Sequence, residues 1–287
     1  MFDQISILGP GLLGTSLALA IRKRWPSSRI HLYARRPEVA KVCASRPWCD
    51  EAFQDPVAAV AGSGLVVACT PVNHIVDLGK QLQEEADFQG ILTDVGSTKG
   101  LICRSISTTG AKGSEFLGSH PMAGGEKSGM EAAEADLFEG RVCLICPTPK
   151  NSRTVIEKLT RFWSELGMIT RKMSPEEHDR GIAKVSHLPH YISSCLAAFL
   201  NGDQHRDQLV SISGPGLKDT TRIAAGDPAL WVEIAMQNRD AILQSLESFQ
   251  VELDHLRVFL REDNPSALGE LLERGAAFRR QLDETPG

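Results

Sequence analysis

Short apolar runs alternate with amphipathic stretches through the first part of the chain. Each run ends in polar or turn-forming residues, a pattern that is typical of buried strands. Four such runs lie at 5–8, 29–36, 64–72 and 90–100. Residues 15–25 and 73–85 lie between them and carry apolar side chains at helical spacing. Alternating strands and helices predict a doubly wound parallel sheet, and the runs at 141–147 and 167–173 predict further strands.

The pattern changes near residue 174, after which helical spacing continues without clear strands. The letters SPEE provide a helix start, with Ser174 as N-cap, Pro175 at the first helical position and Glu177 three residues after the cap. We therefore expect an α/β domain over 1–173 and an all-α domain over 174–287.

The all-α domain is expected to contain one long helix from about 229 to 261. Its apolar residues recur at the spacing that places them on one face. This stripe consists of Ile234, Ile242, Leu246, Phe249, Leu253, Leu256 and Phe259. Because a domain of this size does not need so much apolar surface for its own core, we expect a homodimer formed through this domain.

Three glycines follow the first predicted strand directly. Gly9, Gly11 and Gly14 form the pattern G-x-G-x-x-G at the start of the next predicted helix. There they allow a tight turn, close approach of the backbone to a pyrophosphate, and close packing of helix on strand. A structural turn without a ligand is the alternative, but the setting predicts a Rossmann-like dinucleotide-binding domain. The predicted cofactor-binding residues of this turn and of the third strand's end are Gly9, Gly11, Leu12, Leu13, Gly14, Thr70 and Pro71.

The end of the second predicted strand indicates which cofactor binds. NAD-binding domains of this type carry an acidic residue near this point for the ribose hydroxyls, whereas this chain reads YARRPE. Arg35 and Arg36 are suited to a 2′-phosphate, because guanidinium groups bind phosphate oxygens and a carboxylate would repel them. The sequence therefore favours NADP over NAD as the NAD(P)+ cofactor. The alternative is that both arginines are merely solvated and bind no cofactor.

The segment GSHPMAGGEKSG, residues 118–129, surrounds one histidine with small residues. Glycine-rich backbone approaches ligands closely, so we expect a loop around a ligand, with His120 at its mouth. A surface turn with a satisfied histidine is the alternative. Since the strands of a doubly wound sheet end at the ligand crevice, Ser97, Lys99 and His120 are expected to share one pocket.

Composition argues against several partners and sites. A net charge of -5 provides no basic surface for nucleic acid or for a membrane, and no apolar run is long enough to cross a bilayer. The N-terminus shows no signal-peptide pattern, so a cytoplasmic protein is expected. Cys143 and Cys146 have C-x-x-C spacing, but they lie in an apolar run without a second pair, so we expect buried thiols and no metal site.

Taken together, these segments resemble the prephenate and arogenate dehydrogenase family of tyrosine biosynthesis. The likeness covers nearly the whole chain, in the family's order, through the segments ILGPGLLGTSLA, DVGSTKG, HPMAGGEKSG, VSHLPH and KDTTRIAAGDPALW. It implies oxidative decarboxylation of prephenate to 4-hydroxyphenylpyruvate with hydride transfer to NAD(P)+. Dehydrogenation of arogenate, which gives tyrosine directly, is the alternative that the resemblance leaves open.

The resemblance also implies three catalytic residues. Neutral His120, with an ordinary pKa of about 6.5, would accept the proton of the substrate's ring hydroxyl. Ser97 would hydrogen-bond that hydroxyl and help to orient His120. His190 would help to position the substrate or the cofactor.

For the substrate, the resemblance implies three further residues. Arg222 would bind the ring carboxylate, although an ion pair with Asp219 is an alternative role for it. Glu126 would take part in gating or in recognition of the side chain. Trp231 would serve either its own site or that of the partner in a dimer, with an interface or core tryptophan as the alternative.

Other classes of protein share parts of this pattern. Another two-domain nicotinamide enzyme, such as a pyrroline-carboxylate reductase or a β-hydroxyacid dehydrogenase, would also join a dinucleotide domain to a helical domain. The combination of HPMAG with SHLPH argues against both. A nucleotide-sensing protein without catalysis would keep the glycine turn but would not need Ser97, His120 and Arg222, which are all present.

Overall fold

A six-stranded parallel sheet forms the centre of the first domain. The structure is a computed structural model and describes residues 2–124 and 129–284. The strands of this sheet are β1 (Gln4–Leu8), β2 (Arg29–Tyr33), β3 (Glu51–Phe53), β4 (Leu65–Ala68), β5 (Ile91–Asp94) and β6 (Glu115–Phe116). They lie in the order β3-β2-β1-β4-β5-β6. Every neighbouring pair is parallel, which confirms the predicted doubly wound sheet.

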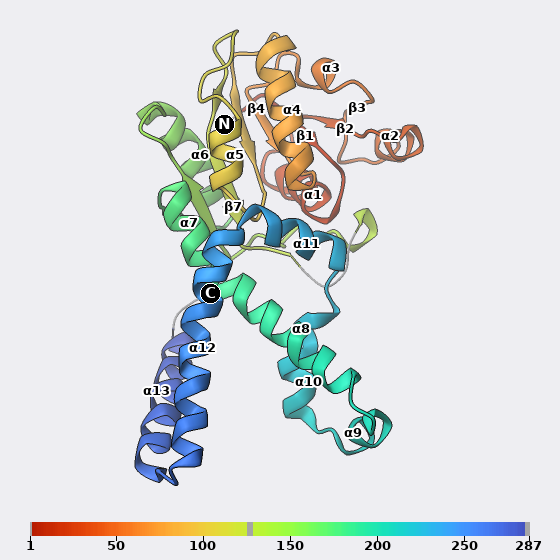
Figure 1. Cartoon of the computed structure of the whole chain (residues 1–287). Helices are drawn as coiled ribbons and strands as arrows, with labels where there is room; N and C mark the ends of the chain where they lie inside the picture. Colours follow the sequence, from red (N-terminus) through yellow and green to blue (C-terminus); the bar gives the residue numbers. More distant parts are fainter. Residues whose placement is uncertain (1, 125–128, 285–287) are drawn as a thin grey trace.

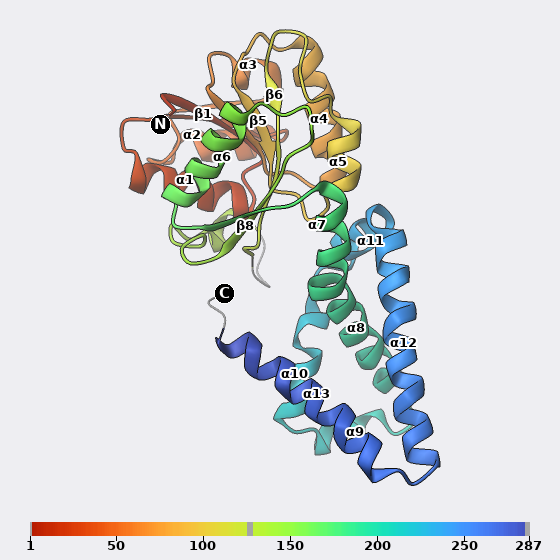
Figure 2. The same ribbon diagram turned by 90° about the vertical axis from the view of Figure 1, so that its left-hand side faces the viewer.

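Alternate residues of the central strands enter two separate apolar cores. Leu65 and Val67 of β4 belong to one cluster of buried side chains, whereas Val66 and Ala68 belong to the other. This alternation follows from the two-residue period of a strand, and it requires helices on both faces. Figures 1 and 2 show these helices around the sheet. They are α1 (Leu12–Arg24), α2 (Pro37–Ala44), α3 (Pro56–Val60), α4 (Val72–Glu85), α5 (Gly100–Ser105) and α6 (Arg153–Glu165).

A second sheet of three strands carries His120. Its strands are β7 (Gly118–Pro121), β8 (Val142–Cys146) and β9 (Ile169–Lys172), in that order. The last two strands were predicted, but they lie outside the main sheet. The expectation of a loop over 118–129 is wrong for its first four residues, because β7 pairs antiparallel with β8 and places His120 opposite Leu144. Pairing with a distant strand stabilises an extended conformation that the glycine content does not reveal.

The described chain beyond residue 173 contains helices and no strand, as predicted. Helix α7 begins with a capping box, in which Ser174 Oγ accepts from the Glu177 N–H and the Glu177 carboxylate accepts from the Ser174 N–H. The α12 and α13 helices are joined at the end far from the first domain and form an open V (Figure 2), while α8 and α10 form an arm to one side of them in Figure 1. The elements are α7 (Pro175–Ile182), the π-helix η2 (Ala183–His187), α8 (Leu188–Asn201), α9 (Arg206–Ile212), α10 (Pro215–Thr221), the 3-10 helix η3 (Arg222–Ala225), α11 (Pro228–Gln237), α12 (Arg239–Arg261) and α13 (Pro265–Glu284).

The single helix predicted over 229–261 is interrupted at Asn238, so that prediction is wrong. Asn238 has φ -116° and ψ 29°, and it separates α11 from α12. Its side-chain Nδ2 donates to the carbonyl oxygen of Asp179 at 2.8 Å and lies 3.2 Å from Nδ1 of His187. These contacts with another helix stabilise the break, and apolar spacing on either side of it gives no sign of them.

Helix α11 connects the second domain to the N-terminus of α4. The backbone N–H of Asn73 donates to Oε1 of Glu233 at 2.8 Å. Gln237 donates to Oδ1 of Asn73 at 3.1 Å and accepts from the hydroxyl of Thr98 at 2.9 Å. The first N–H groups of a helix have no partner within that helix, so a carboxylate from the other domain satisfies one of them. Figure 1 shows α11 immediately below the first domain.

Two glycines of the turn have different surroundings, which separates their roles. A Cβ at position 14 would lie 2.0 Å from the carbonyl oxygen of Gly9, whereas a Cβ at position 11 would have nothing within 4 Å. We expect Gly14→Ala to lower the free energy of unfolding by about 1–3 kcal/mol, because α1 must move away from the turn. Urea unfolding followed by circular dichroism measures this loss.

Gly11→Ala is the matched control for this variant. Its free energy of unfolding should stay within about 0.5 kcal/mol of the wild type, because the new methyl group has open space. Equal losses in the two variants would contradict the close packing of α1 against the turn.

Candidate active site

The glycine turn forms one wall of a cavity of about 540 Å³. Six predicted cofactor residues line this cavity, namely Gly9, Gly11, Arg35, Arg36, Thr70 and Pro71. Three others do not: Leu12 lines a second cavity, Leu13 is half-buried in α1, and Gly14 is buried where any Cβ would meet Gly9.

The turn fits the pyrophosphate of a dinucleotide. Gly9 has φ +106°, a left-handed conformation that favours glycine, and the open space at Gly11 leaves the backbone accessible. The hydroxyl of Thr70 is buried and makes no hydrogen bond with any described residue. A cradle of exposed backbone and an unpaired hydroxyl at a helix N-terminus matches the needs of a phosphate ligand.

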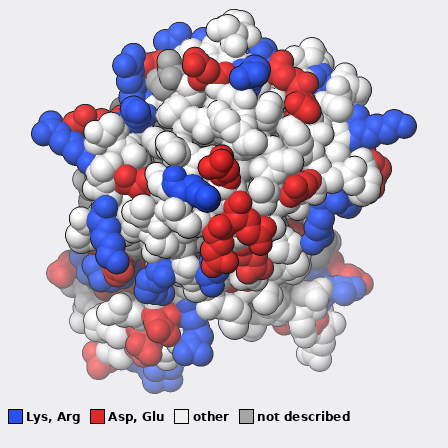
Figure 3. Space-filling model, turned by 90° about the horizontal axis from the view of Figure 1, so that it is seen from above, with Lys and Arg blue, Asp and Glu red and all other residues white. Residues whose placement is uncertain are grey.

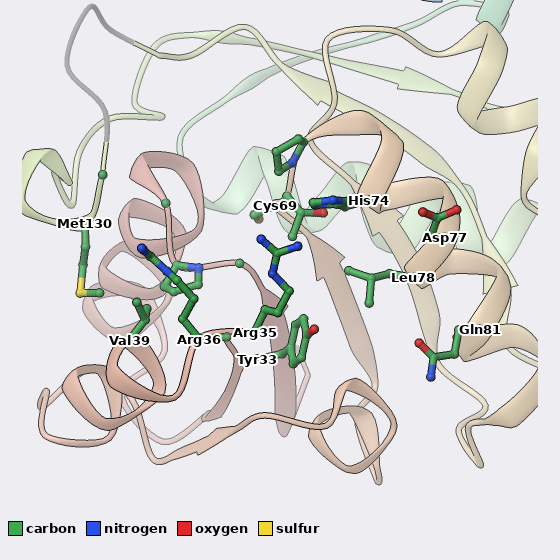
Figure 4. Close-up of a pocket in the computed structure, with 17 residues that line it drawn as sticks. Tyr33, Arg35, Arg36, Val39, Cys69, His74, Asp77, Leu78, Gln81 and Met130 are labelled. Atoms are coloured by element: carbon green, nitrogen blue, oxygen red, sulfur yellow. The ribbon is translucent and has the colours of Figure 1, made fainter. Parts of the chain in front are cut away.

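Two arginines face the far end of the same cavity. Figure 4 shows Arg35 and Arg36 extending from the end of β2, with Arg36 toward the side that carries Met130. Arg36 Nε lies 3.7 Å from the carboxylate of Glu38, and both side chains are exposed. Helix α4 contributes Asp77 to the opposite side of the cavity.

His120 lies on β7 and is 7% exposed. The residue before it fixes the strand in place. The hydroxyl of Ser119 donates to the carbonyl oxygen of Asp94 at 2.7 Å and lies 3.2 Å from the indole nitrogen of Trp163. These bonds attach β7 to the carboxyl end of β5, so His120 stands at the edge of the sheet where ligands bind.

Two residues of the helical domain extend from His120 as a hydrogen-bonded chain. Nδ1 of His120 lies 2.9 Å from Nε2 of the fully buried His178, and Nδ1 of His178 lies 2.8 Å from Oδ1 of Asp179. The Asp179 carboxylate also accepts the backbone N–H groups of Lys99 at 2.7 Å and Gly100 at 2.8 Å. This carboxylate therefore joins α7 to the start of α5.

The Asp179 carboxylate determines where the ring protons lie. Burial alone would raise the pKa of Asp179, but hydrogen bonds from His178 and from the Lys99 N–H outweigh it and lower the pKa. An ionised carboxylate only accepts, so Nδ1 of His178 donates to it. Burial lowers the pKa of His178 and keeps its ring neutral, so its Nε2 accepts from Nδ1 of His120. The remaining nitrogen of His120, Nε2, is left with a lone pair.

The surroundings also keep His120 neutral. Burial is the largest cause that lowers the pKa of His120 well below 6.5, and the neighbouring His178 and Lys99 lower it further. A neutral imidazole with a lone pair on Nε2 is the form that accepts a proton. The ring of His120 is therefore held in its neutral form at pH values below the ordinary pKa of histidine.

Lys99 does not face a ligand pocket, so the expectation that it shares one with His120 is wrong. Its side chain is fully buried and forms an ion pair with the equally buried Asp94. A buried ammonium requires such a partner, because its desolvation would otherwise be very costly. The pair lies under β7, since a Cβ at Gly118 would come within 3.3 Å of Lys99 Cδ.

A second cavity, of about 580 Å³, brings together residues from both domains. Its lining includes the predicted residues Leu12, His190, Arg222 and Trp231, together with Gly124, Glu134 and Arg141. The rings of His190 and Trp231 are stacked, with centroids 3.5 Å apart and an interplanar angle of 10°. Gly226 makes room for them, because a Cβ there would lie 2.7 Å from the indole nitrogen.

Three predicted catalytic or substrate-binding residues are not among those that line the second cavity. His120 lines neither this cavity nor the first. Ser97 is half-buried in the loop after β5 and makes no hydrogen bond with His120 in the described structure. Glu126 lies outside the described residues.

Sequence reasoning missed His178 and Asp179. They occur within SPEEHD, which was interpreted only as a helix start. The acidic and imidazole groups are adjacent in the chain, and this adjacency is the one available signal. Their link to His120, 58 residues away, depends on how α7 docks against β7.

Other features of the described chain add little to the site. No helix in the described part of the chain is long and apolar enough to span a membrane, and the described residues contain no cluster of His, Cys, Asp and Glu suited to a metal ion. Cys143 and Cys146 are buried free thiols, and burial raises their pKa values. Figure 3 shows basic and acidic side chains interspersed on the upper face, with acidic ones gathered near its centre.

Comparisons with known proteins match both domains. The family model for the nucleotide-binding domain of prephenate dehydrogenase matches residues 17–171, and that for its dimerization domain matches residues 174–274. The prephenate dehydrogenase of Bacillus subtilis is 30% identical over 284 residues, which are 98% of this chain and 76% of that protein. The cyclohexadienyl dehydrogenase of Zymomonas mobilis is 29% identical over 284 residues, which are 98% of this chain and 97% of that protein.

A solved structure agrees with these matches. The prephenate dehydrogenase of A. aeolicus, crystallised in complex with hydroxyphenyl propionate and NAD+, superposes with a TM-score of 0.90 at 30% identity. The likeness covers 98% of each chain. The matches to both domains, together with the glycine turn, show that this chain is an oxidoreductase that belongs to the prephenate dehydrogenase family.

Proposed function

We propose that this chain oxidises and decarboxylates prephenate to 4-hydroxyphenylpyruvate, with hydride transfer to NAD(P)+. One observation carries the proposal: His120 is buried at the sheet edge, and its chain to His178 and Asp179 leaves a lone pair on Nε2. The reaction needs a base for the ring hydroxyl proton, and this nitrogen is suited to accept it.

The first cavity would hold the cofactor. Gly9, Gly11 and Thr70 would contact its pyrophosphate, for the reasons given above. When bound, NAD(P)+ accepts the hydride from the ring carbon of the substrate. His120 then carries the hydroxyl proton on Nε2, and the positive charge that it gains is stabilised through His178 by the carboxylate of Asp179.

The second cavity would hold the substrate. Arg222 is suited to bind the ring carboxylate, and the stacked rings of His190 and Trp231 provide a flat apolar wall for the substrate ring. Ser97 would reach the ring hydroxyl from the loop after β5, as the family resemblance implies. Loss of the ring carboxylate as carbon dioxide produces an aromatic product, which makes the overall reaction favourable.

Arogenate is the second candidate substrate, and one observation favours it. Arogenate carries an amino group where prephenate carries a keto group, and Glu134 supplies an acidic side chain to the second cavity. An ion pair between that carboxylate and the amine would favour arogenate. The turnover of both compounds by the wild type, followed by the absorbance of reduced nicotinamide, decides between them.

Removal of the base is the sharpest test of the mechanism. His120→Asn should lower kcat by about 10²- to 10⁴-fold and leave KM nearly unchanged, because the proton moves only as the hydride leaves. In the wild type, kcat/KM should fall on the acid side only below pH 6.5, since burial lowers the pKa of His120. The variant should lose this acid limb.

The exposed His205 provides the matched control, and His205→Asn should keep the wild-type rate and pH profile. Near-normal kcat in His120→Asn, with the acid limb intact, would contradict the assignment of the base.

The cofactor preference rests on the two arginines at the end of β2. We expect NADP+ to bind more tightly than NAD+, because Arg35 and Arg36 face the cavity and the strand end carries no acid. Titration calorimetry with each cofactor measures the two dissociation constants. The double variant Arg35→Ala, Arg36→Ala should weaken NADP+ binding selectively, and a wild type that prefers NAD+ would refute this expectation.

A homodimer through the helical domain would cover apolar surface that is exposed in a single chain. Phe199 and Ile212 are each 73% exposed, and Met236 and Leu260 are more than half exposed. Sedimentation at micromolar concentration should give twice the chain mass of 31.2 kDa. A single-chain mass under these conditions would rule out the dimer.

A further inference from the structure

His187 is a buried histidine to which the mechanism above gives no task. It ends the π-helix η2, a rare type of helix turn that is frequent at functional sites. Only 1% of the residue is exposed. One of its ring nitrogens, Nε2, makes no hydrogen bond with any described residue. Buried polar groups without partners are rare in folded proteins and call for a physical reason.

The neighbouring hydrogen bonds show that this nitrogen carries a proton. The carbonyl oxygen of Asp179 only accepts, so the group of Asn238 that faces it at 2.8 Å is the amide nitrogen Nδ2. The same Nδ2 lies 3.2 Å from Nδ1 of His187 and donates its other hydrogen there. Nδ1 of His187 is therefore an acceptor. In a neutral ring, the proton then lies on Nε2.

The ring is neutral at physiological pH. Burial is the main cause that lowers the pKa of His187 to about 4. The charged and titratable groups around it are Asp179, His178 and His190, and Asp179 is the one that opposes the shift. The Nε2–H of His187 is thus a neutral, buried donor without a partner among the described residues, a state that lowers folding stability.

The donor lies among the groups of the proposed site. Nδ1 faces Asn238 at the start of α12, so Nε2 is directed away from that helix. The ring of Trp231, which lines the second cavity, stands nearly perpendicular to the His187 ring at a centroid distance of 6.2 Å. His187 is also close enough to His120 to help lower the pKa of that base. His187 does not itself line that cavity, so the inference requires Trp231, which does, to shift when the ligand binds.

We propose that the Nε2–H of His187 donates a hydrogen bond to an oxygen of the bound ligand, and that the free protein keeps this donor unpaired for that purpose. The inference rests on the proposed function, because the cofactor and the substrate of that reaction each carry an oxygen that can accept this hydrogen bond. One is the carboxamide oxygen of the nicotinamide, and the other is the ring oxygen of the substrate, on which negative charge develops as its proton leaves.

Two substitutions separate the nitrogens of this ring. In His187→Asn, the side-chain amide is placed near the Nδ1 position and preserves an acceptor for Asn238, but the ligand-side donor is lost. In His187→Gln, the longer side chain returns an N–H near the Nε2 position. Exposed His205→Asn is the matched control, and thermal unfolding of each variant checks that the fold is retained.

Calorimetry measures binding without turnover, first with NAD+ and NADP+ alone and then with hydroxyphenyl propionate in the presence of NAD+. We expect His187→Asn to raise the dissociation constant of one of these ligands by about tenfold or more. His187→Gln should restore most of the lost affinity. Weaker binding of the cofactor alone assigns the donor to the carboxamide. An effect limited to hydroxyphenyl propionate assigns it to the substrate oxygen.

Nuclear magnetic resonance of protein labelled with [15N]histidine provides a second readout. The His187 signal, identified by its absence in His187→Asn, should show a proton on Nε2 and should shift when the same probe binds. Unchanged ligand affinities in His187→Asn, together with a His187 signal that does not shift on binding, would overturn the proposal. The Nε2–H would then interact with the Trp231 ring or with a buried water. If the signal moves but neither prephenate nor arogenate is turned over, this inference stands and the proposed function fails.

Discussion

One carboxylate, that of Asp179, contacts both domains and fixes the orientation of His178 beside His120. It accepts two backbone N–H groups at the start of α5 in the first domain and the ring N–H of His178 in the second. These bonds keep it ionised despite its burial. Because an ionised carboxylate can only accept, a single group determines the docking of α7 and the protonation of two imidazoles. The same residue's carbonyl oxygen binds Asn238 and so places His187 as well.

The interior of the first domain contains a charged pair close to His120. Lys99 and Asp94 form a fully buried ion pair beneath β7. Such a pair contributes little net stability, but breaking it by removing one partner leaves an isolated buried charge. Its positive end also helps to keep His120 neutral. The pair is therefore best understood as part of the electrostatic setting of the base.

Local signals in the sequence were sufficient for the fold and for part of the site. The glycine turn, the strands of the main sheet and the cap at Ser174 each depend on residues close together in the chain, so their patterns can be read directly. The break at Asn238, the strand that carries His120 and the burial of Lys99 depend on partners far away in sequence. The His120–His178–Asp179 chain also depends on distant partners, because the residues next to His120 in the sequence give no sign of His178 or Asp179.

The helical domain has an unusual interior. Among its described residues, the buried side chains include six polar ones, His178, His187, His190, Ser193, Asn238 and Ser245, against Pro175, Ile182, Ala183, Ile234 and Ile242. Many large apolar side chains of this domain, which would ordinarily form its core, are instead exposed on the helices of its arms. In the proposed dimer, folding of these arms and association of the two chains would be one equilibrium, so dilution would loosen the arms and disorder the histidines at their base.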